Sequence, residues 1–322
     1  MKYLLLADVH LGVHKSSDIW HDVVIDLFFD IQDKCINKGI KDIIILGDFF
    51  DTRKSVNVKT IHTAYDVSNI FSSSDITIHI LVGNHDTYYK SQIKPSSLEI
   101  FKETDNIHII DEPTVMDDIL FVPWDTSFDG DAKYCFGHFD IIGFLMNQNY
   151  VAKDGLDPEV FNKFEKVISG HYHTPSNQGN ITYLGAPYQL DFHDAGGKRG
   201  YYVFEDGELE FIEYTGAPRY IIMSSEDEPK DIEGNIIKIK FTKDYGHNKN
   251  NDIIDKVSSM NPQQLHVDFS KTQGEEVEEE HNVSILEHKD IIREYVMNSE
   301  PPSHIKKDIV LNMINKMLKE EE

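Results

Sequence analysis

Five short polar clusters in this chain directly follow apolar runs, and their side chains are of types that bind metal ions. The clusters are Asp8-Val9-His10, Gly47-Asp48-Phe49-Phe50-Asp51, Gly83-Asn84-His85-Asp86, Gly137-His138 and Gly170-His171-Tyr172-His173. Carboxylates, an amide oxygen and imidazoles together suit first-row divalent ions such as manganese, iron or zinc better than magnesium or calcium alone. Two such ions can activate a water molecule and hold the oxygens of a phosphoryl group. These residues therefore predict hydrolytic phosphoryl chemistry at a dinuclear centre.

The apolar runs before the first three clusters read as buried parallel strands, and amphipathic helices separate them. We expect strands over residues 3–7, 42–46 and 76–82, with helices over 19–37 and 57–71. This β-α-β-α-β order predicts a layered α/β domain. Parallel strands in such a sheet have their carboxyl ends along one edge, so the polar clusters are expected to meet there.

After residue 100 the pattern changes to short strands with brief connections, and two of these strands also end in polar clusters. The strands are expected at 107–110, 119–123, 133–136, 166–169, 181–184, 200–204 and 208–214. Gly207 between the last two reads as a hairpin turn. Strands at 220–223, 236–241 and 265–269, with a helix at 250–260, predict a small α/β subdomain.

The last fifty residues differ in composition from the rest of the chain. Residues 271–283 include five glutamates and no aromatic residue, which predicts an acidic, solvated linker. Apolar residues spaced along one face predict helices over 284–297 and 303–318, and Pro301-Pro302 prevents one continuous helix. This hairpin has little core of its own, so we expect it to bind a partner.

Charge and cysteine content narrow the class of protein. The 322 residues include 31 basic and 56 acidic side chains, a net charge of −25 that argues against binding nucleic acid through a broad basic face. A nuclease that contacts phosphates through bound cations and a few lysines remains compatible. No apolar run approaches the roughly 18 residues of a membrane span. Two distant cysteines fit a reducing cytoplasm.

The five clusters, in this order, resemble the motifs of the calcineurin-like metallophosphoesterases. The phrases Ala7-Asp8-Val9-His10-Leu11-Gly12, Gly47-Asp48-Phe49-Phe50-Asp51 and Leu184-Gly185-Ala186-Pro187-Tyr188 are similar to those of the SbcD-like double-strand-break repair nucleases. The resemblance implies a four-layer α/β sandwich of two mixed β-sheets flanked by helices. Its parts would be a nuclease domain at 1–218, a capping or DNA-binding subdomain at 219–270, and a linker before the helical hairpin at 284–322.

The resemblance also implies roles for the polar residues. One metal ion would be held by Asp8, His10, Asp48 and His173. Asp48 would bridge to a second ion, held also by Asn84, His138 and His171. The ions would be Mn²⁺, with Mg²⁺ as the alternative. His85 would be the acid that protonates or stabilises the leaving oxygen, Asp86 would orient His85, and Asp51 would support a neighbouring ligand.

The implied partners are DNA, a second copy of the chain and an SMC-like ATPase of the SbcC type. DNA phosphates could contact Lys15, Arg53, Lys54, Lys90 and Lys94. The ATPase would bind the C-terminal hairpin through Ile291, Ile292, Tyr295, Ile309, Met313 and Met317. A homodimer within a heterotetramer would form through helices at 57–71 and 94–103, although their apolar residues could equally face the core.

The expected activity is a metal-dependent DNA exonuclease or endonuclease, the catalytic subunit of an SbcCD-type recombination complex. A phosphatase or cyclic-nucleotide phosphodiesterase is the alternative enzyme, because bound metals interact with a phosphate and not with its substituents. A catalytically idle scaffold for an ATPase is the alternative outside enzymes. The tethered C-terminal hairpin favours the nuclease.

Overall fold

The computed structural model describes residues 1–269, apart from residues 91, 128–129 and 148–149. The predicted linker, the C-terminal helices and the six ATPase-binding residues proposed on them lie outside the described residues. The domain boundaries expected near residues 270 and 283 therefore stay predictions.

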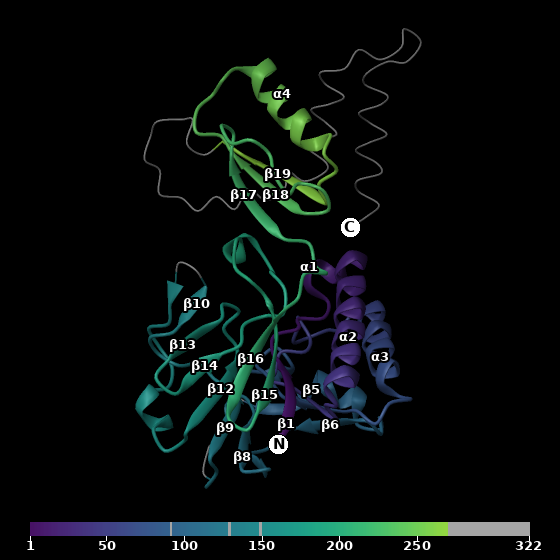
Figure 1. Cartoon of the computed structure of the whole chain (residues 1–322), viewed down its shortest axis with the longest axis vertical. Coiled ribbons are helices and arrows are strands. Elements are labelled where there is room, and N and C mark those ends of the chain that lie inside the picture. Colours follow the sequence, from purple (N-terminus) through teal and green to yellow (C-terminus); the bar gives the residue numbers. More distant parts are fainter. Residues whose placement is uncertain (91, 128–129, 148–149, 270–322) are drawn as a thin grey trace. The chain divides into compact units, whose positions relative to one another are not determined.

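The first sheet is mixed and six-stranded, in the order β16-β15-β1-β2-β3-β6. Its strands are β1 (Lys2–Leu6), β2 (Asp42–Ile45), β3 (Thr77–Leu81), β6 (Ile107–Ile110), β15 (Gly200–Glu205) and β16 (Glu208–Glu213). Strands β1, β2, β3 and β6 run parallel, and β15 and β16 add an antiparallel edge. Helices α2 (Asp18–Lys38) and α3 (Val58–Phe71) lie together on one side of this sheet (Figure 1). The predicted β-α-β-α-β order is confirmed.

Alternate side chains of β1 belong to different apolar clusters, one on each face of this sheet. Leu4 and Leu6 belong to the apolar cluster shared with α2 and α3. Tyr3 and Leu5 belong to a different cluster, which includes residues of a second sheet. Successive side chains of a strand point to opposite faces, so a strand buried on both sides reads as a continuous apolar run.

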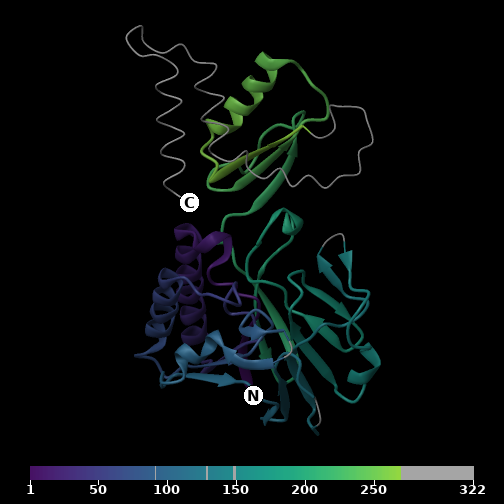
Figure 2. The same cartoon turned by 180° about the vertical axis from the view of Figure 1, so that it is seen from behind.

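The second sheet is also mixed and six-stranded, in the order β13-β14-β12-β9-β8-β7. Its strands are β7 (Thr114–Met116), β8 (Ile119–Val122), β9 (Tyr134–His138), β12 (Lys166–Gly170), β13 (Ser176–Gln178) and β14 (Ile181–Tyr183). Phe121, Phe136 and Ile168 pack from this sheet against β1 and β2 of the first. Figure 2 shows the two sheets from behind, the second in teal. The predicted sandwich of two mixed sheets is confirmed.

The outer face of the second sheet is covered differently from the outer face of the first. Its apolar cluster includes Phe139, Phe144, Phe161, Phe164 and Tyr172. These residues come from strand ends, loops and the 3-10 helix η2 (Pro158–Phe161), beside the short hairpin of β10 (Leu145–Asn147) and β11 (Tyr150–Val151). In the described residues, aromatic side chains from irregular segments form this layer where the family resemblance implied helices.

Residues 220–268 form a separate sheet with its own core. Strands β17 (Tyr220–Ser224), β18 (Ile236–Lys240) and β19 (Gln264–Asp268) run parallel. Helix α4 (His247–Ser258) connects β18 to β19 and begins three residues before the predicted position. Ile237, Ile239 and Val257 are buried inside this unit. The small α/β subdomain expected from the sequence is therefore present.

The prediction of a helix at 94–103 was wrong. Strands β4 (Thr87–Tyr89) and β5 (Gln92–Ser96) form a hairpin, and the 3-10 helix η1 (Ser97–Phe101) follows. Pro95 interrupts helical hydrogen bonding, and the Ser96 hydroxyl accepts from the N–H of Leu98 to cap η1. Leu98 and Phe101 are fully buried in the core, so they are not part of a dimer surface. The predicted helix 57–71 is confirmed as α3, with Tyr65 44% exposed.

Across the described residues, no helix is both long enough and apolar enough to cross a membrane.

The turn after β2 requires glycine because the two sheets approach each other closely there. Gly47 has a φ of +88°, and an added Cβ would lie less than 3.0 Å from the ring of His138 on β9. A side chain at this position would strain the backbone and also displace an imidazole of the second sheet.

A pair of glycine substitutions tests this packing. Gly47→Ala is expected to lower the free energy of unfolding by about 3 kcal/mol, from the left-handed backbone and the clash together. Gly39→Ala is the matched control, because Gly39 has a φ of +64° and nothing within 4 Å of an added Cβ. It should lose only about 1–2 kcal/mol. Equal losses in urea unfolding would contradict the close approach.

Candidate metal centre

The seven predicted metal ligands converge at the carboxyl ends of parallel strands from both sheets. Asp8 and His10 follow β1, Asp48 follows β2, Asn84 follows β3, His138 ends β9, and His171 and His173 follow β12. Both carboxylates, His10, Asn84 and His138 are buried, and none is more than 6% exposed. The structure thus brings together residues more than 160 positions apart in the sequence.

The first group consists of Asp8, His10 and His173, whose possible ligand atoms all lie within 4.8 Å of one another. Nε2 of His10 and Nε2 of His173 are 3.0 Å apart. Two ring nitrogens at this distance need a proton or a cation between them, because two lone pairs repel. The Asp8 carboxylate accepts hydrogen bonds from the backbone N–H of His171 at 2.9 and 3.2 Å, which ties β12 to β1.

The second group consists of Asp48, His138 and His171, which satisfy the same distance limit. Nδ1 of His138 lies 2.7 Å from the carbonyl oxygen of Leu46 and must donate to it. When Nε2 carries no proton, its lone pair therefore points into the group. The inner atom of the Asn84 amide lies 2.8 Å from this Nε2 and also 2.8 Å from Nδ1 of His171.

The orientation of the Asn84 amide depends on what it faces. Its outer atom lies 2.8 Å from Nη2 of Arg53, which favours an outward oxygen, while the inner atom faces only His138, His171 and Asp48. With the amide oxygen inward, four hydrogen-bond acceptors converge on one point, and a cation is the group that satisfies all of them. These acceptors belong to Asn84, His138, His171 and Asp48. The donor set therefore fits a metal ion.

The Asp48 carboxylate joins the two groups. Its Oδ1 accepts from the backbone N–H of His85 at 2.7 Å. Its Oδ2 lies 3.4 Å from Nε2 of His138 and 3.9 Å from Nε2 of His10. One oxygen is thus fixed by the turn after β3, and the other lies between an imidazole of each group.

Burial and charge determine the protonation of these side chains in the metal-free protein. Burial opposes ionisation of Asp48, yet the imidazoles of His138, His10 and His85 hold its pKa below the usual range. Burial lowers the pKa of His171 to about 3 and that of His173 well below its usual value. The centre therefore favours an ionised Asp48 with neutral His171 and His173, the forms that bind metal. Burial opposes a charge on His138, but the Asp48 carboxylate raises the pKa of this ring to about 9, so a metal ion has to displace its proton.

Several candidate ligands have unusual backbone conformations. Asp8, His10, Asp48 and His171 have φ values of 55°, 47°, 50° and 95°. Residues other than glycine seldom adopt such values, which raise the energy of the fold and tend to gather at functional sites. The sharp turns direct each side chain from its strand end into the gap between the sheets.

Asp86 does not orient His85 as predicted. Its fully buried carboxylate accepts hydrogen bonds from the backbone N–H groups of Gly83 and Phe50 at 3.0 Å and of Phe49 at 3.4 Å. It thereby joins the turn after β3 to the loop that carries Asp48. Burial, with the charge of Asp48, raises the pKa of Asp86 to about 7. The Asp86 side chain folds back under its own turn, so its carboxylate contacts these backbone N–H groups and not the ring of His85.

His85 is oriented by Asp51 instead. Nδ1 of His85 lies 2.6 Å from the carbonyl oxygen of Asp51 and donates to it, which leaves Nε2 as the nitrogen that exchanges a proton. The Asp51 carboxylate lies 3.5 Å from Nδ1 of His10. Asp51 thus contacts both the candidate acid and a candidate ligand, as expected of a supporting residue.

The candidate DNA-binding residues fall into different surroundings. Arg53 lies against Asn84 at the centre, as described above. Lys15, Lys54 and Lys90 are exposed. Lys94 pairs with Asp111 at 2.7 Å, so its charge is already partly balanced.

A cleft of about 270 Å³ opens at the centre, lined by Asp48, His85, His171 and His173. It also includes Asp191 and His193, which pair at 3.2 Å beside the 3-10 helix η3 (Phe192–Asp194). The sequence interpretation left His193 as an ordinary residue because it follows no predicted strand. Trp124 was also missed, although it follows β8 as the polar clusters follow other strands; its ring lies 5.0 Å from that of His171.

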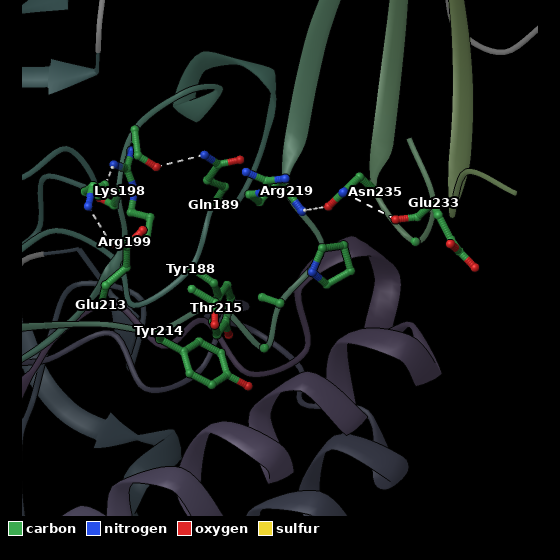
Figure 3. Close-up of a pocket in the computed structure, with 15 residues that line it drawn as sticks. Tyr188, Gln189, Lys198, Arg199, Glu213, Tyr214, Thr215, Arg219, Glu233 and Asn235 are labelled. Atoms are coloured by element: carbon green, nitrogen blue, oxygen red, sulfur yellow. Dashed lines mark hydrogen bonds and ion pairs between the residues drawn. The ribbon is translucent and has the colours of Figure 1, made fainter. Parts of the chain in front are cut away.

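A larger cavity of about 470 Å³ lies elsewhere and includes none of the seven candidate ligands. Figure 3 shows its residues, which largely bond to one another. Lys198 pairs with Glu213 at 2.6 Å, and the backbone N–H of Arg219 donates to Oδ1 of Asn235 at 2.7 Å. Its volume alone therefore does not make this cavity the reaction site.

The family model for the calcineurin-like phosphoesterases matches residues 1–204, more than half of the chain and every candidate ligand. The chain is a calcineurin-like phosphoesterase. A calcineurin-like phosphoesterase hydrolyses phosphate esters, and enzymes of this family use two divalent metals, in agreement with two ligand groups that lie on either side of the Asp48 Oδ2 atom.

Exonuclease subunit 1 of Enterobacteria phage T4 is 33% identical to this phosphoesterase over 230 residues, which cover 66% of this chain and 67% of the phage protein. This match agrees with the SbcD-like motifs and with their likeness to the recombination endonuclease subunits of T-even phages. The nuclease MPE of Pseudomonas putida is 16% identical, with a TM-score of 0.34 over 65% of this chain and 87% of that one. A dimetal phosphatase of Danio rerio is 11% identical, with a TM-score of 0.40 over 63% and 91%.

Replacing Asp86 distinguishes the observed role from the predicted one. Asp86→Asn puts an amide NH₂ against backbone N–H donors, so the free energy of unfolding should fall by about 1–3 kcal/mol. Urea unfolding measures this loss. Unchanged stability with a reduced turnover number would instead restore the role of Asp86 in orienting His85.

Proposed function

We propose that this phosphoesterase is a DNA nuclease with two divalent metal ions, the catalytic subunit of a recombination complex of the SbcCD type. The observation that carries the proposal is the Asp48 carboxylate, which lies between His10 and His138 and so joins two ligand groups. The similarity to a phage exonuclease subunit over two thirds of the chain supports DNA as the substrate.

Asp8, His10, Asp48 and His173 would hold one ion, and Asp48, Asn84, His138 and His171 the other. Mn²⁺ suits this mixture of nitrogen and oxygen ligands, and Mg²⁺ is the alternative. The bound pair would supply an activated water as nucleophile and positive charge opposite the phosphoryl oxygens.

His85 would act as the general acid. The carbonyl oxygen of Asp51 fixes the ring through Nδ1, so Nε2 carries the proton that moves to the leaving oxygen. The backbone N–H of His85 donates to Asp48 at 2.7 Å, which links the turn of the acid to the loop of the metal ligand. An imidazole suits this work because it exchanges its proton near neutral pH.

Contacts with DNA would combine the bound cations with a few basic side chains. Arg53, next to Asn84, is placed to approach a phosphate at the centre. Lys15, Lys54 and Lys90 would contact phosphates further along the strand, and Lys94 would have to leave Asp111 to do so. These contacts are few, consistent with a net charge of −25.

The remaining parts of the proposal concern assembly. The helices predicted from the sequence at 284–297 and 303–318 would bind an SMC-like ATPase through their apolar faces, within a heterotetramer that contains two copies of this chain. Such a complex would work in the cytoplasm, in a bacterial host if the chain is phage-encoded. The relative from phage T4 is named a subunit, which agrees with a multi-chain enzyme.

The Asp48→Asn variant tests the function directly. Removing the shared charge should reduce bound Mn²⁺ from two ions per chain to one or none. Cleavage of end-labelled duplex DNA should fall by more than roughly 100-fold, the upper range for loss of a supporting hydrogen bond. Metal analysis and gel assays measure the two effects.

Asp42→Asn is the matched control for Asp48→Asn. Asp42 begins the same strand at its opposite end and bonds His79 at 3.0 Å. It should keep both ions and near-normal cleavage. Wild-type cleavage by Asp48→Asn would reject the metal assignment. Hydrolysis of a small phosphodiester without any cleavage of DNA would favour the alternative phosphodiesterase.

His85 and Asn84 are adjacent residues with different expected phenotypes. His85→Gln should keep both metal ions and lose roughly 10²–10⁴-fold in cleavage rate, the usual contribution of a general acid. Asn84→Ala should weaken the binding of one ion by about tenfold or more. Metal titration beside single-turnover cleavage separates the two, and metal loss in His85→Gln would make His85 a ligand.

A further inference from the structure

A second cavity of about 270 Å³ adjoins the metal centre and shares His138 with it. Apolar walls come from Trp124, Phe139 and Leu156. The described residues of the β8–β9 connection and the loop before η2 form it, on the outer side of the second sheet. The mechanism proposed above leaves this cavity unused.

Trp124 is held rigidly at the wall between this cavity and the metal centre. Its backbone N–H donates to the carbonyl oxygen of Val82 at 2.9 Å, and its indole N–H to that of Lys90 at 3.4 Å. The ring lies 5.0 Å from that of His171 and 5.9 Å from that of His138. The indole is only partly buried, so a planar ligand can pack against it.

The polar groups of this cavity accept hydrogen bonds. Asp125 and Asp140 contribute carboxylates, and Thr126 donates its hydroxyl hydrogen to the carbonyl oxygen of Pro123, which leaves its oxygen as an acceptor. One oxygen of Asp140 accepts from the hydroxyl of Tyr172, and a carboxylate can accept further bonds. Two carboxylates repel a phosphate group but attract a neutral group that carries N–H donors.

We propose that this cavity binds the nucleobase next to the scissile phosphate, stacked on Trp124, with its amino group donating to the cavity's carboxylates. The inference rests on the proposed nuclease function and adds a preference to it. Adenine, guanine and cytosine carry exocyclic amino groups and thymine does not. Bases with an amino group should therefore be favoured over thymine at this position.

Tryptophan fluorescence tests the stacking directly. The chain has two tryptophans, and Trp20 is 3% exposed in the core, so a ligand in the cavity changes chiefly the emission of Trp124. With Mg²⁺ present, dAMP should quench the emission of the full chain saturably, dTMP more weakly, and 2-deoxyribose 5-phosphate not at all. The quenching should disappear in Trp124→Phe. Equal effects of dAMP and the sugar phosphate would overturn the proposal.

Cleavage of DNA with a single abasic nucleotide beside the scissile phosphate provides the second test. The wild-type chain should cleave intact DNA roughly 5–100-fold better than the abasic substrate, the range expected for one base stacked on an aromatic ring. Trp124→Ala should lose this ratio and Trp124→Phe should keep most of it. Asp140→Asn should reduce the preference for adenine over thymine.

Phe211→Ala is the control, because Phe211 is an aromatic residue 39% exposed on β16 that lines neither cavity. It should keep the wild-type ratio. If Trp124→Ala slows cleavage of both substrates equally, the indole only supports His171 and the proposal is overturned. If the wild-type chain cleaves the abasic and the intact substrate equally well, the base-binding proposal is also overturned. The proposed nuclease function is not affected by that result. Absence of any metal-dependent cleavage by the wild-type chain would reject the nuclease function itself.

Discussion

The charge of Asp48 is the constraint on which the rest of the centre depends. A carboxylate that is 1% exposed is strongly destabilising unless hydrogen bonds and opposite charges surround it. One oxygen receives the backbone N–H of His85, and the other lies near the imidazoles of His10 and His138. The turn after β3, the end of β1 and the end of β9 must therefore all meet at the end of β2.

This convergence explains local features that would otherwise lower stability. Gly47 lets β2 turn against His138, and the buried Asp86 ties the loop after β2 to the turn after β3. Asp8, Asp48 and His171 have left-handed backbone conformations that a loop free of function would seldom retain. The two apolar clusters that flank β1 supply the packing that holds these strained ends in position.

The electrostatics of the centre account for how so acidic a chain can attract a phosphate ester. The converging carboxylates and imidazole nitrogens form a candidate cation site, and Arg53 adds one positive charge beside Asn84. Attraction to a phosphate then arises at the reaction centre and not over a broad basic face. The neighbouring cavity has the opposite character, because its carboxylates suit the hydrogen-bond donors of a base.

Local patterns in the sequence sufficed to predict most strands of the two large sheets, helices α2 and α3, and the types of residue at the strand ends, because apolar runs, amphipathic spacing and glycine turns are local properties of the chain. The short strands β4, β5, β7, β10, β11 and β13 were not predicted. The sequence also sufficed to predict that Asp8, Asp48 and Asn84 meet, since the parallel strands of one sheet place their carboxyl ends along one edge. His138, at the end of a strand in the second sheet, joins them only through the packing of the two sheets. The predictions that depended on side-chain reach could not be made this way. Asp86 bonds the loop of Phe49 and Phe50 because of how its turn folds back.

Only the tertiary structure decided which neighbour orients which ring. The tautomer of His138 depends on Leu46, 92 residues away, and that of His85 on Asp51, 34 residues away. Trp124 gains its position from hydrogen bonds to Val82 and Lys90, on a separate part of the chain. Such contacts are set by the packing of two sheets, and no periodicity within one segment encodes them.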